Sequence, residues 1–209
     1  MTSEHERGER AAQILEAADE LISEVGYDGA SAARVAKRAN VNKALVFYYF
    51  GSKERLFEEV LERYYRAHQQ ALASAFSSPG PVRERLHRMM DAYFDFVVAN
   101  ERYPRLVQQL VSSGDRHLAL VQRNLAPMFD WISNALADIA PATGPLAARQ
   151  FFVTFSATVI NYFTYGPVLA AMWGDDPTSD GALDERRAHL HWLVDTILDR
   201  LQAEAGTEP

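Results

Sequence analysis

Five basic side chains lie close together in a chain that is acidic overall. No acidic residue lies between positions 31 and 53, while the basic residues there are Arg34, Lys37, Arg38, Lys43 and Lys53. This segment carries +5, which leaves −12 for the rest of a chain whose formal net charge is −7. Ammonium and guanidinium groups bind phosphate, and a local positive face on a negative protein favours one docking orientation. The segment is a candidate phosphate-binding surface, although a solvated helix face would have the same composition.

Local signals divide this segment into two short helices. Ser31 can cap the first helix, in which Val35 and Ala39 would point inward. Asn40 belongs to the residue type that, after glycine, most readily adopts the left-handed backbone conformation, so a tight turn can follow. Asn42 can then cap the second helix, KALVFYY. Two short helices joined by a three-residue turn predict a helix-turn-helix.

Longer helices are expected on either side of the two short ones. Apolar residues recur at helical spacing from Ile14 to Val25 and stop at Gly26, a suitable C-terminal cap. On the other side, Ser52 can cap a helix whose first turn holds Lys53. Free backbone N–H groups and an ammonium would meet there, which favours phosphate binding.

The segment resembles the tetracycline-repressor (TetR) family of transcription regulators. The residues that carry the resemblance are Ser31, Val35-Ala36, Ala39-Asn40-Val41-Asn42, Phe47 through Phe50, and Lys53-Glu54-Arg55-Leu56. The chain departs from the family pattern at Phe47, where a tyrosine hydroxyl usually donates to a phosphate. Tyr48 and Tyr49 are the candidates to replace that contact.

The resemblance implies a homodimeric repressor that binds a palindromic operator in double-stranded DNA and is released by a small-molecule effector. By position, Lys43, Ala44 and Leu45 would meet base edges, and Lys53 would meet the phosphate backbone. The full set of expected DNA-binding residues is Ser31, Ala33, Arg34, Lys43, Ala44, Leu45, Phe47, Tyr48, Tyr49 and Lys53.

The periodicity of the whole chain predicts an all-α fold of about nine helices without strands. We expect a three-helix helix-turn-helix DNA-binding domain over residues 1–52 and a helical bundle for effector binding and dimerisation over residues 53–209. Two helices, Ala147 to Met172 and Asp184 to Leu201, are the expected dimer elements, which could form a four-helix interface across a two-fold axis.

The second part is rich in aromatic and methionine side chains, which indicate either a packed core or a pocket for an apolar ligand. No cluster of Arg or Lys lies in its apolar stripes, so a neutral or weakly polar, aromatic or lipid-like effector is expected. The candidate pocket residues are Met90, Tyr93, Phe94, Trp131, Phe155, Thr158, Asn161, Tyr162 and Tyr165.

Other classes of function find little support in the sequence. The chain has no cysteine and none of the common phosphate-loop, nucleophile-elbow or zinc-protease motifs. His189 and His191 are two residues apart, which places them on different sides of a helix rather than on one metal, and we expect them at the surface. We therefore expect no enzyme activity, cofactor or metal. The alternative function is a helical protein-protein interaction module that presents its basic face to an acidic protein.

A membrane location is also disfavoured. No charged residue occurs from Gln150 to Gly174, a length that could cross a bilayer, but Gly166-Pro167 breaks the stretch. A buried helix explains this composition better than a membrane span. The charged first residues lack the apolar region of a signal peptide, so a cytoplasmic protein is expected.

Overall fold

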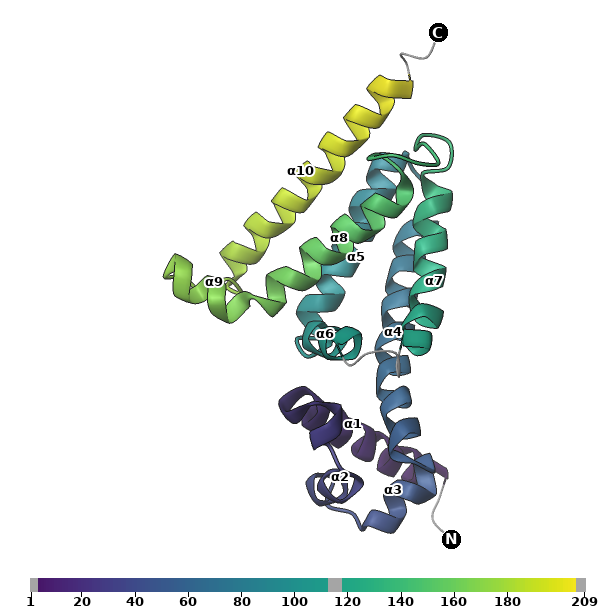
Figure 1. Ribbon diagram of the computed structural model, residues 1–209, viewed down its shortest axis with the longest axis vertical. Helices are drawn as coiled ribbons and strands as arrows, with labels where there is room; N and C mark the ends of the chain where they lie inside the picture. Colours follow the sequence, from purple (N-terminus) through teal and green to yellow (C-terminus); the bar gives the residue numbers. More distant parts are fainter. Residues whose placement is uncertain (1–3, 113–117, 206–209) are drawn as a thin grey trace. The chain divides into compact units, whose positions relative to one another are not determined.

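Every regular element in the described part of the chain is a helix (Figure 1). The structure is a computed structural model that describes residues 4–112 and 118–205. The expected all-α fold is confirmed. The helices are α1 (Glu4–Gly29), α2 (Ala32–Arg38), α3 (Lys43–Phe50), α4 (Lys53–Ser77), α5 (Val82–Ala99), α6 (Tyr103–Ser112), α7 (Leu118–Ala135), α8 (Ala148–Thr164), α9 (Gly166–Trp173) and α10 (Asp180–Ala205).

Ten helices are present over these residues, rather than about nine, because the expected helix from Ala147 to Met172 is two helices. Helix α8 ends at Thr164 and α9 begins at Gly166. Pro167 lies in the first turn of α9, where its missing N–H costs nothing, whereas inside a continuous helix its ring would clash with a carbonyl one turn earlier.

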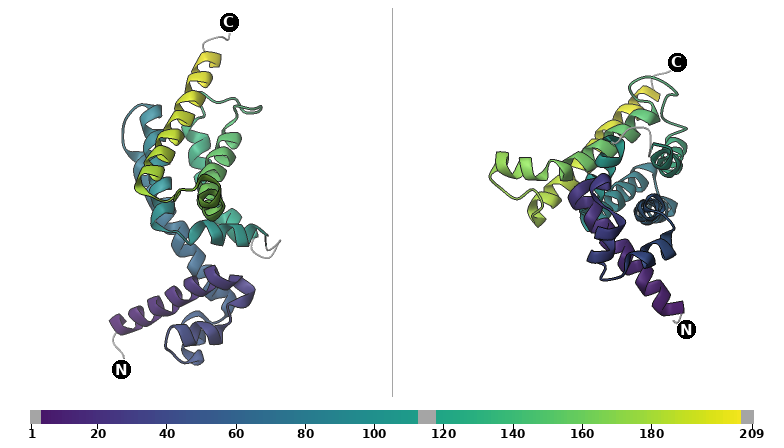
Figure 2. Two further views of the ribbon diagram at one scale, coloured as in Figure 1. Left: turned by 90° about the vertical axis from the view of Figure 1, so that its left-hand side faces the viewer. Right: turned by 60° about the horizontal axis from the view of Figure 1, so that its bottom comes forward.

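The chain forms two compact units. The first unit comprises Met1–Arg66 and Arg105–Val121, and the second comprises Ala67–Pro104 and Gln122–Pro209. Helix α2 contacts both α1 and α3 in the first unit, and α5 contacts both α8 and α10 in the second (Figure 2). The expected boundary between a DNA-binding domain and an effector-binding domain, at residues 52 and 53, stays a prediction.

A buried carboxylate joins α1 to α4 within the first unit. Asp19 is 1% exposed, and its Oδ2 accepts a hydrogen bond of 2.6 Å from the Tyr64 hydroxyl. The same oxygen lies 2.8 Å from a guanidinium nitrogen of Arg63, which also binds Glu16. The two helices are therefore held in one register by a charge that has no access to water.

A ladder of charged side chains joins α5 to α10 within the second unit. The two helices carry the same residue types at the same four-residue spacing, namely Arg83, His87, Asp91 and Asp95 on α5 and Arg187, His191, Asp195 and Asp199 on α10. Arg83 binds the two aspartates of the α10 pattern, Asp195 and Asp199. Arg187 binds those of the α5 pattern, Asp91 and Asp95. The arginine at the start of each pattern pairs with the aspartates at the end of the other pattern, which requires the two helices to be antiparallel.

Two histidine rings stack at the centre of this ladder. His87 and His191 lie 4.3 Å apart with an interplanar angle of 7°. The Nε2 atom of His191 is 2.8 Å from Asp91 Oδ1, so this half-buried side chain is part of a helix contact. Of the two histidines expected at the surface, His189 is exposed, whereas His191 is half-buried in a helix contact that leaves no local signal in the sequence.

The uncharged segment from Gln150 to Gly174 is not the buried helix expected from its composition, because Val153, Met172 and Trp173 are each more than half exposed. Among the described residues, no helix is both long and apolar enough to cross a bilayer.

A histidine with unsatisfied nitrogens is buried in the core of the second unit. His68 is 2% exposed and lies between the rings of Tyr93 and Phe96, at centroid distances of 4.7 and 4.8 Å. Neither ring nitrogen has a hydrogen-bond partner among the described residues. Burial lowers the pKa of His68 to about 4, so the imidazole is neutral in the folded chain at neutral pH.

We predict that His68 makes the stability of the protein sensitive to mild acid. The unfolded chain takes up a proton on this residue below about pH 6.5, whereas the folded chain does so only near pH 4. Stability therefore falls as the pH falls, and His68 accounts for a loss of roughly 2 kcal/mol between pH 7 and pH 5. Urea unfolding of the original protein and of His68→Phe at both pH values measures this contribution.

The replacement should remove that part of the pH dependence without lowering stability at pH 7, because it deletes two unpartnered polar atoms. His189→Gln changes an exposed histidine and serves as the matched control. Equal pH dependence in the original protein and in His68→Phe would contradict the assignment.

Candidate nucleic-acid interface

Side-chain caps and one left-handed residue form the two short helices. The Ser31 hydroxyl accepts from the backbone N–H of Arg34 at 3.3 Å, and Asn42 Oδ1 accepts from that of Leu45 at 2.9 Å. Asn40 has a φ of 50°, the only positive value at a non-glycine residue in the described chain. The predicted helix-turn-helix is confirmed, because each cap satisfies a backbone donor that the short helix leaves free.

The buried face of α2 allows a close crossing with α3. Val35, Ala36 and Ala39 are each at most 3% exposed, and Val46 of α3 is 1% exposed. The small Ala36 lets the second helix approach closely, so the contact needs few residues. The remaining faces of both helices are left toward solvent.

One face of α3 is open for contacts with a ligand. Lys43, Ala44, Phe47 and Tyr48 are all exposed, and Tyr48 is 65% exposed. These positions follow the helical repeat, so the four side chains share one side of α3. The Lys43 ammonium also lies 5.6 Å from the centroid of the Phe47 ring. An exposed aromatic and cationic helix face of this kind suits the major groove of DNA.

The other predicted DNA-binding residues differ in exposure. Ser31, Ala33 and Arg34 are exposed, whereas Leu45 and Tyr49 are half-buried. Their individual roles in DNA binding stay predictions.

The basic segment offers less free charge than its composition suggests. Two nitrogens of Arg38 bind the two oxygens of Glu24 at 2.7 and 2.8 Å, and Arg34 donates to the Gly29 carbonyl at 2.7 Å. Lys37 and Lys43 have no carboxylate partner in the described part of the chain. Arg38 is therefore neutralised by Glu24, which lies outside the basic segment in sequence, whereas the carbonyl partner of Arg34 orients that guanidinium and leaves its charge in place.

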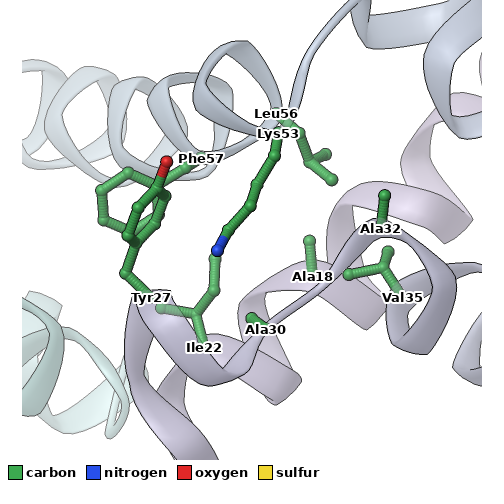
Figure 3. A pocket seen from close by; sticks show the side chains of 9 residues that line it. All are labelled: Ala18, Ile22, Tyr27, Ala30, Ala32, Val35, Lys53, Leu56 and Phe57. Atoms are coloured by element: carbon green, nitrogen blue, oxygen red, sulfur yellow. The ribbon is translucent and has the colours of Figure 1, made fainter.

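Lys53 lies in a small recess between α1 and the start of α4 (Figure 3). Its side chain extends toward the end of α1, and its ammonium lies 4.1 Å from the centroid of the Tyr27 ring. The residue is half-buried, and no carboxylate among the described residues binds it. The side chains that line the recess are Ala18, Ile22, Tyr27, Ala30, Ala32, Val35, Lys53, Leu56 and Phe57.

Tyr27 is connected to α4 by two further contacts. Its ring lies 4.6 Å from that of Phe57, and its hydroxyl donates to Glu54 Oε1 at 3.2 Å. The pKa of Glu54 is lowered by hydrogen bonds from its own backbone N–H, the Ser52 hydroxyl and the Tyr27 hydroxyl. Ser52 also caps α4 as expected, because its hydroxyl accepts from the backbone N–H of Arg55 at 3.1 Å.

Sequence reasoning missed Tyr27 and Asp19. Asp19 lies within the apolar stripe of α1, four residues after Leu15 and three before Ile22, and an acidic residue in such a stripe could have indicated a buried partner. Tyr27 gave no comparable signal, because its contacts come from residues that are 26 or more positions away.

The candidate effector residues occupy different environments in the second unit. Met90, Phe94 and Tyr162 are buried, while Tyr93, Trp131, Phe155 and Thr158 are half-buried. Asn161 and Tyr165 are exposed, so their place in a pocket stays a prediction, as does that of the other seven.

A single cation lies beside two of these residues. The Arg186 guanidinium is 4.8 Å from the centroid of the Tyr162 ring and donates to the Thr158 carbonyl at 2.8 Å. Its Nε atom is buried without a hydrogen-bond partner, and burial lowers the pKa of this guanidinium. The Tyr162 hydroxyl itself donates to the Pro177 carbonyl at 2.7 Å. The region is therefore less uniformly apolar than the sequence indicated.

Comparison with protein families gives a match over the helix-turn-helix. The model for bacterial regulatory proteins of the tetR family matches residues 14–60. The HTH-type transcriptional regulator BetI of Burkholderia thailandensis is 38% identical over 143 residues, which cover 68% of this chain and 73% of that protein.

Two other relatives match a shorter part. The HTH-type transcriptional activator FasR of Mycolicibacterium smegmatis is 33% identical over 48% of this chain. The HTH-type transcriptional repressor NicS of Pseudomonas putida is 32% identical over 47%. The matches span 46% of FasR and 45% of NicS, about half the length of each relative.

The fold extends over nearly the whole chain. A crystal structure of a bacterial regulatory protein in the tetR family from Rhodococcus RHA1 has a TM-score of 0.73 and covers 94% of this chain and 98% of its own. At 17% sequence identity, this likeness concerns the fold alone.

We predict that removal of the Asn42 cap destabilises the protein while a shorter capping residue preserves it. Asn42→Ala leaves the backbone N–H of Leu45 without its side-chain acceptor, which costs about 1 kcal/mol. Asn42→Ser keeps an oxygen at this position and should stay close to the original. Urea unfolding followed by circular dichroism measures both values. Similar losses in the two variants would show that the cap is not the cause.

Proposed function

The chain belongs to the tetR family of bacterial regulatory proteins, which are DNA-binding transcription regulators, and we propose that it is a homodimeric repressor of a palindromic operator. In this proposal a small, largely apolar effector releases the DNA. The observation that carries it is the exposed cationic and aromatic face of α3, held by caps at both ends of the turn.

DNA contacts of two kinds are assigned to the first unit. Lys43, Ala44 and Tyr48 face outward from α3 and would meet base edges in the major groove. Lys53 and the backbone at the start of α4 would meet phosphate, since a cation and a helix N-terminus lie together there. The family membership favours this reading over a protein-protein interaction module, which would need no helix suited to the major groove.

Dimerisation is assigned to an exposed apolar face of the second unit. The described chain exposes Val153 of α8, Met172 and Trp173 of α9, and Trp192 of α10, and Met172 is 73% exposed. Because α8 and α9 carry no charge after Arg149, a second copy could cover this face without burying an unpaired ion. A two-fold axis would then pair two recognition helices, which fits a palindromic DNA site.

Repression and effector release are the finer parts of the proposal. NicS is named a repressor and FasR an activator, so the relatives of this chain include both repressors and activators. We favour repression because a dimer on its operator blocks other proteins by occupancy alone, whereas activation requires a further contact surface. The aromatic side chains of the second unit would hold the apolar body of an effector, and Arg186 could accept one polar or anionic group. The proposed location is the cytoplasm, and no enzyme activity is proposed.

Selection of DNA by the purified protein tests this function. Duplexes bound from a random pool should share an inverted repeat with half-sites about one helical turn apart or slightly more.

Val153→Glu places a charge on the proposed dimer face and should reduce both dimer formation and affinity for the complete repeat, measured by sedimentation and by anisotropy. A selected motif without two-fold symmetry would contradict the homodimeric part of the proposal. Compounds are then screened for release of the selected duplex.

A pair of lysine variants separates base readout from phosphate binding. Lys43→Ala should relax the base preference at one position of each half-site, because a good base contact discriminates by roughly 1–3 kcal/mol. Lys53→Ala should weaken binding to all duplexes alike and flatten the salt dependence by about one unit for each phosphate that is no longer neutralised. Sequencing of selected pools and salt titrations measure the two effects. If the two variants produced the same change, the assigned roles would be wrong.

A further inference from the structure

The structure places the expected phosphate-binding lysine on an aromatic ring rather than free in solvent. We propose that Tyr27 is a positioning residue for DNA binding, which holds the Lys53 ammonium where a DNA phosphate reaches it. The inference rests on the proposed phosphate contact of Lys53 and gives a role to Tyr27, which lies within the residues that the family model matches.

The first support is the geometry of the lysine. Its Nζ atom is 4.1 Å from the centroid of the Tyr27 ring, within the range of a favourable cation–π contact (Figure 3). Apolar side chains line most of the recess, and no carboxylate in the described part of the chain forms a salt bridge with the ammonium, although the charge of Glu54 is near enough to interact with it. The ring carries no formal charge, so the ring contact itself does not neutralise the ammonium. An ammonium has three N–H donors, and an aromatic face cannot satisfy all of them.

The second support is that Tyr27 is itself held in place. Its ring packs against Phe57, and its hydroxyl donates to Glu54, so two residues close to Lys53 on this part of α4 help to orient it. Gly26 has a φ of 74° and a ψ of 171°, a conformation that side chains rarely adopt, and this bend interrupts α1 just before Tyr27. The Tyr27 ring is thus held against α4, and the backbone at Gly26, just before it, is not helical.

The third support is the contrast with the other basic residues. Arg38 reaches its position through Glu24, which also cancels its charge. Lys37 is exposed and has no ring contact in the described chain. An aromatic partner fixes a flexible lysine without neutralising it, and a fixed side chain loses less rotamer entropy when phosphate binds.

A double-mutant cycle on DNA affinity tests the inference. The probe is a labelled duplex of mixed sequence, and dissociation constants are measured by anisotropy at low salt. Replacement of Tyr27 by a trifluorinated phenylalanine keeps the ring shape and weakens its negative face, and Tyr27→Phe is the unfluorinated reference. We expect the fluorinated variant to bind DNA roughly two- to fivefold more weakly than Tyr27→Phe. In a Lys53→Ala background this difference should vanish, whereas in a Lys37→Ala background it should persist.

Three results would overturn the proposal. A fluorination effect that persists with Lys53→Ala would mean that Tyr27 acts only through the fold, and no effect would mean that the ring does not position the lysine. Tighter binding after fluorination would mean that the ring withholds the ammonium from DNA.

The cycle also distinguishes this inference from the proposed function. If Lys53→Ala alone leaves DNA affinity and salt dependence unchanged, the phosphate role of Lys53 is wrong and the positioning role falls with it. If Lys53→Ala weakens binding but is additive with the Tyr27 variants, only the positioning role is wrong. Ring-current shielding of the Lys53 ε-methylene in the Tyr27→Phe protein gives an independent measure of the contact.

Discussion

The buried carboxylate of Asp19 is the constraint on which the arrangement of the first unit depends. One oxygen accepts hydrogen bonds from the Tyr64 hydroxyl and the Arg63 guanidinium, so the middle of α1 and the middle of α4 have a single relative register. A buried charge is tolerated only with such partners, and loss of one partner costs several kcal/mol because the charge cannot reach water. The same register brings Tyr27, near the end of α1, over Lys53 at the start of α4. The proposed phosphate contact therefore depends on an ion pair some distance from any DNA.

The helix-turn-helix could be predicted because its signals are local. Ser31, Asn42 and Ser52 each bind a backbone N–H three residues later, and Asn40 adopts its unusual backbone angle by its own preference. Such interactions depend on neighbours in sequence, so the residue type at one position is informative. The break between α8 and α9 has a local signal as well, because Pro167 acts on its own turn of the chain, but the expected helix from Ala147 to Met172 ran across it.

The contacts that modify the charge and position of the site could not be predicted in this way. Glu24 neutralises Arg38 across 14 residues, and Tyr27 meets Lys53 across 26. A count of charges along the basic segment gives +5, but it misses an acidic residue that approaches from the preceding helix. The ladder between α5 and α10 joins residues about 100 positions apart, which is why the sequence pattern does not show that His191 is part of a helix contact.

This ladder also explains how the second unit can leave an apolar face open. Its ion pairs are partly exposed, so each contributes at most about 1 kcal/mol, but the repeated order of Arg, His, Asp and Asp permits one antiparallel register. The charged groups of the α5 and α10 patterns thereby pair with each other. Helix α8 contacts α5, and some of its uncharged residues, including Val153, are exposed. A helix pair held by specific charges can thus support a neighbouring helix whose exposed side has no charge after Arg149 in its first turn, and that side is the one proposed to meet a second copy.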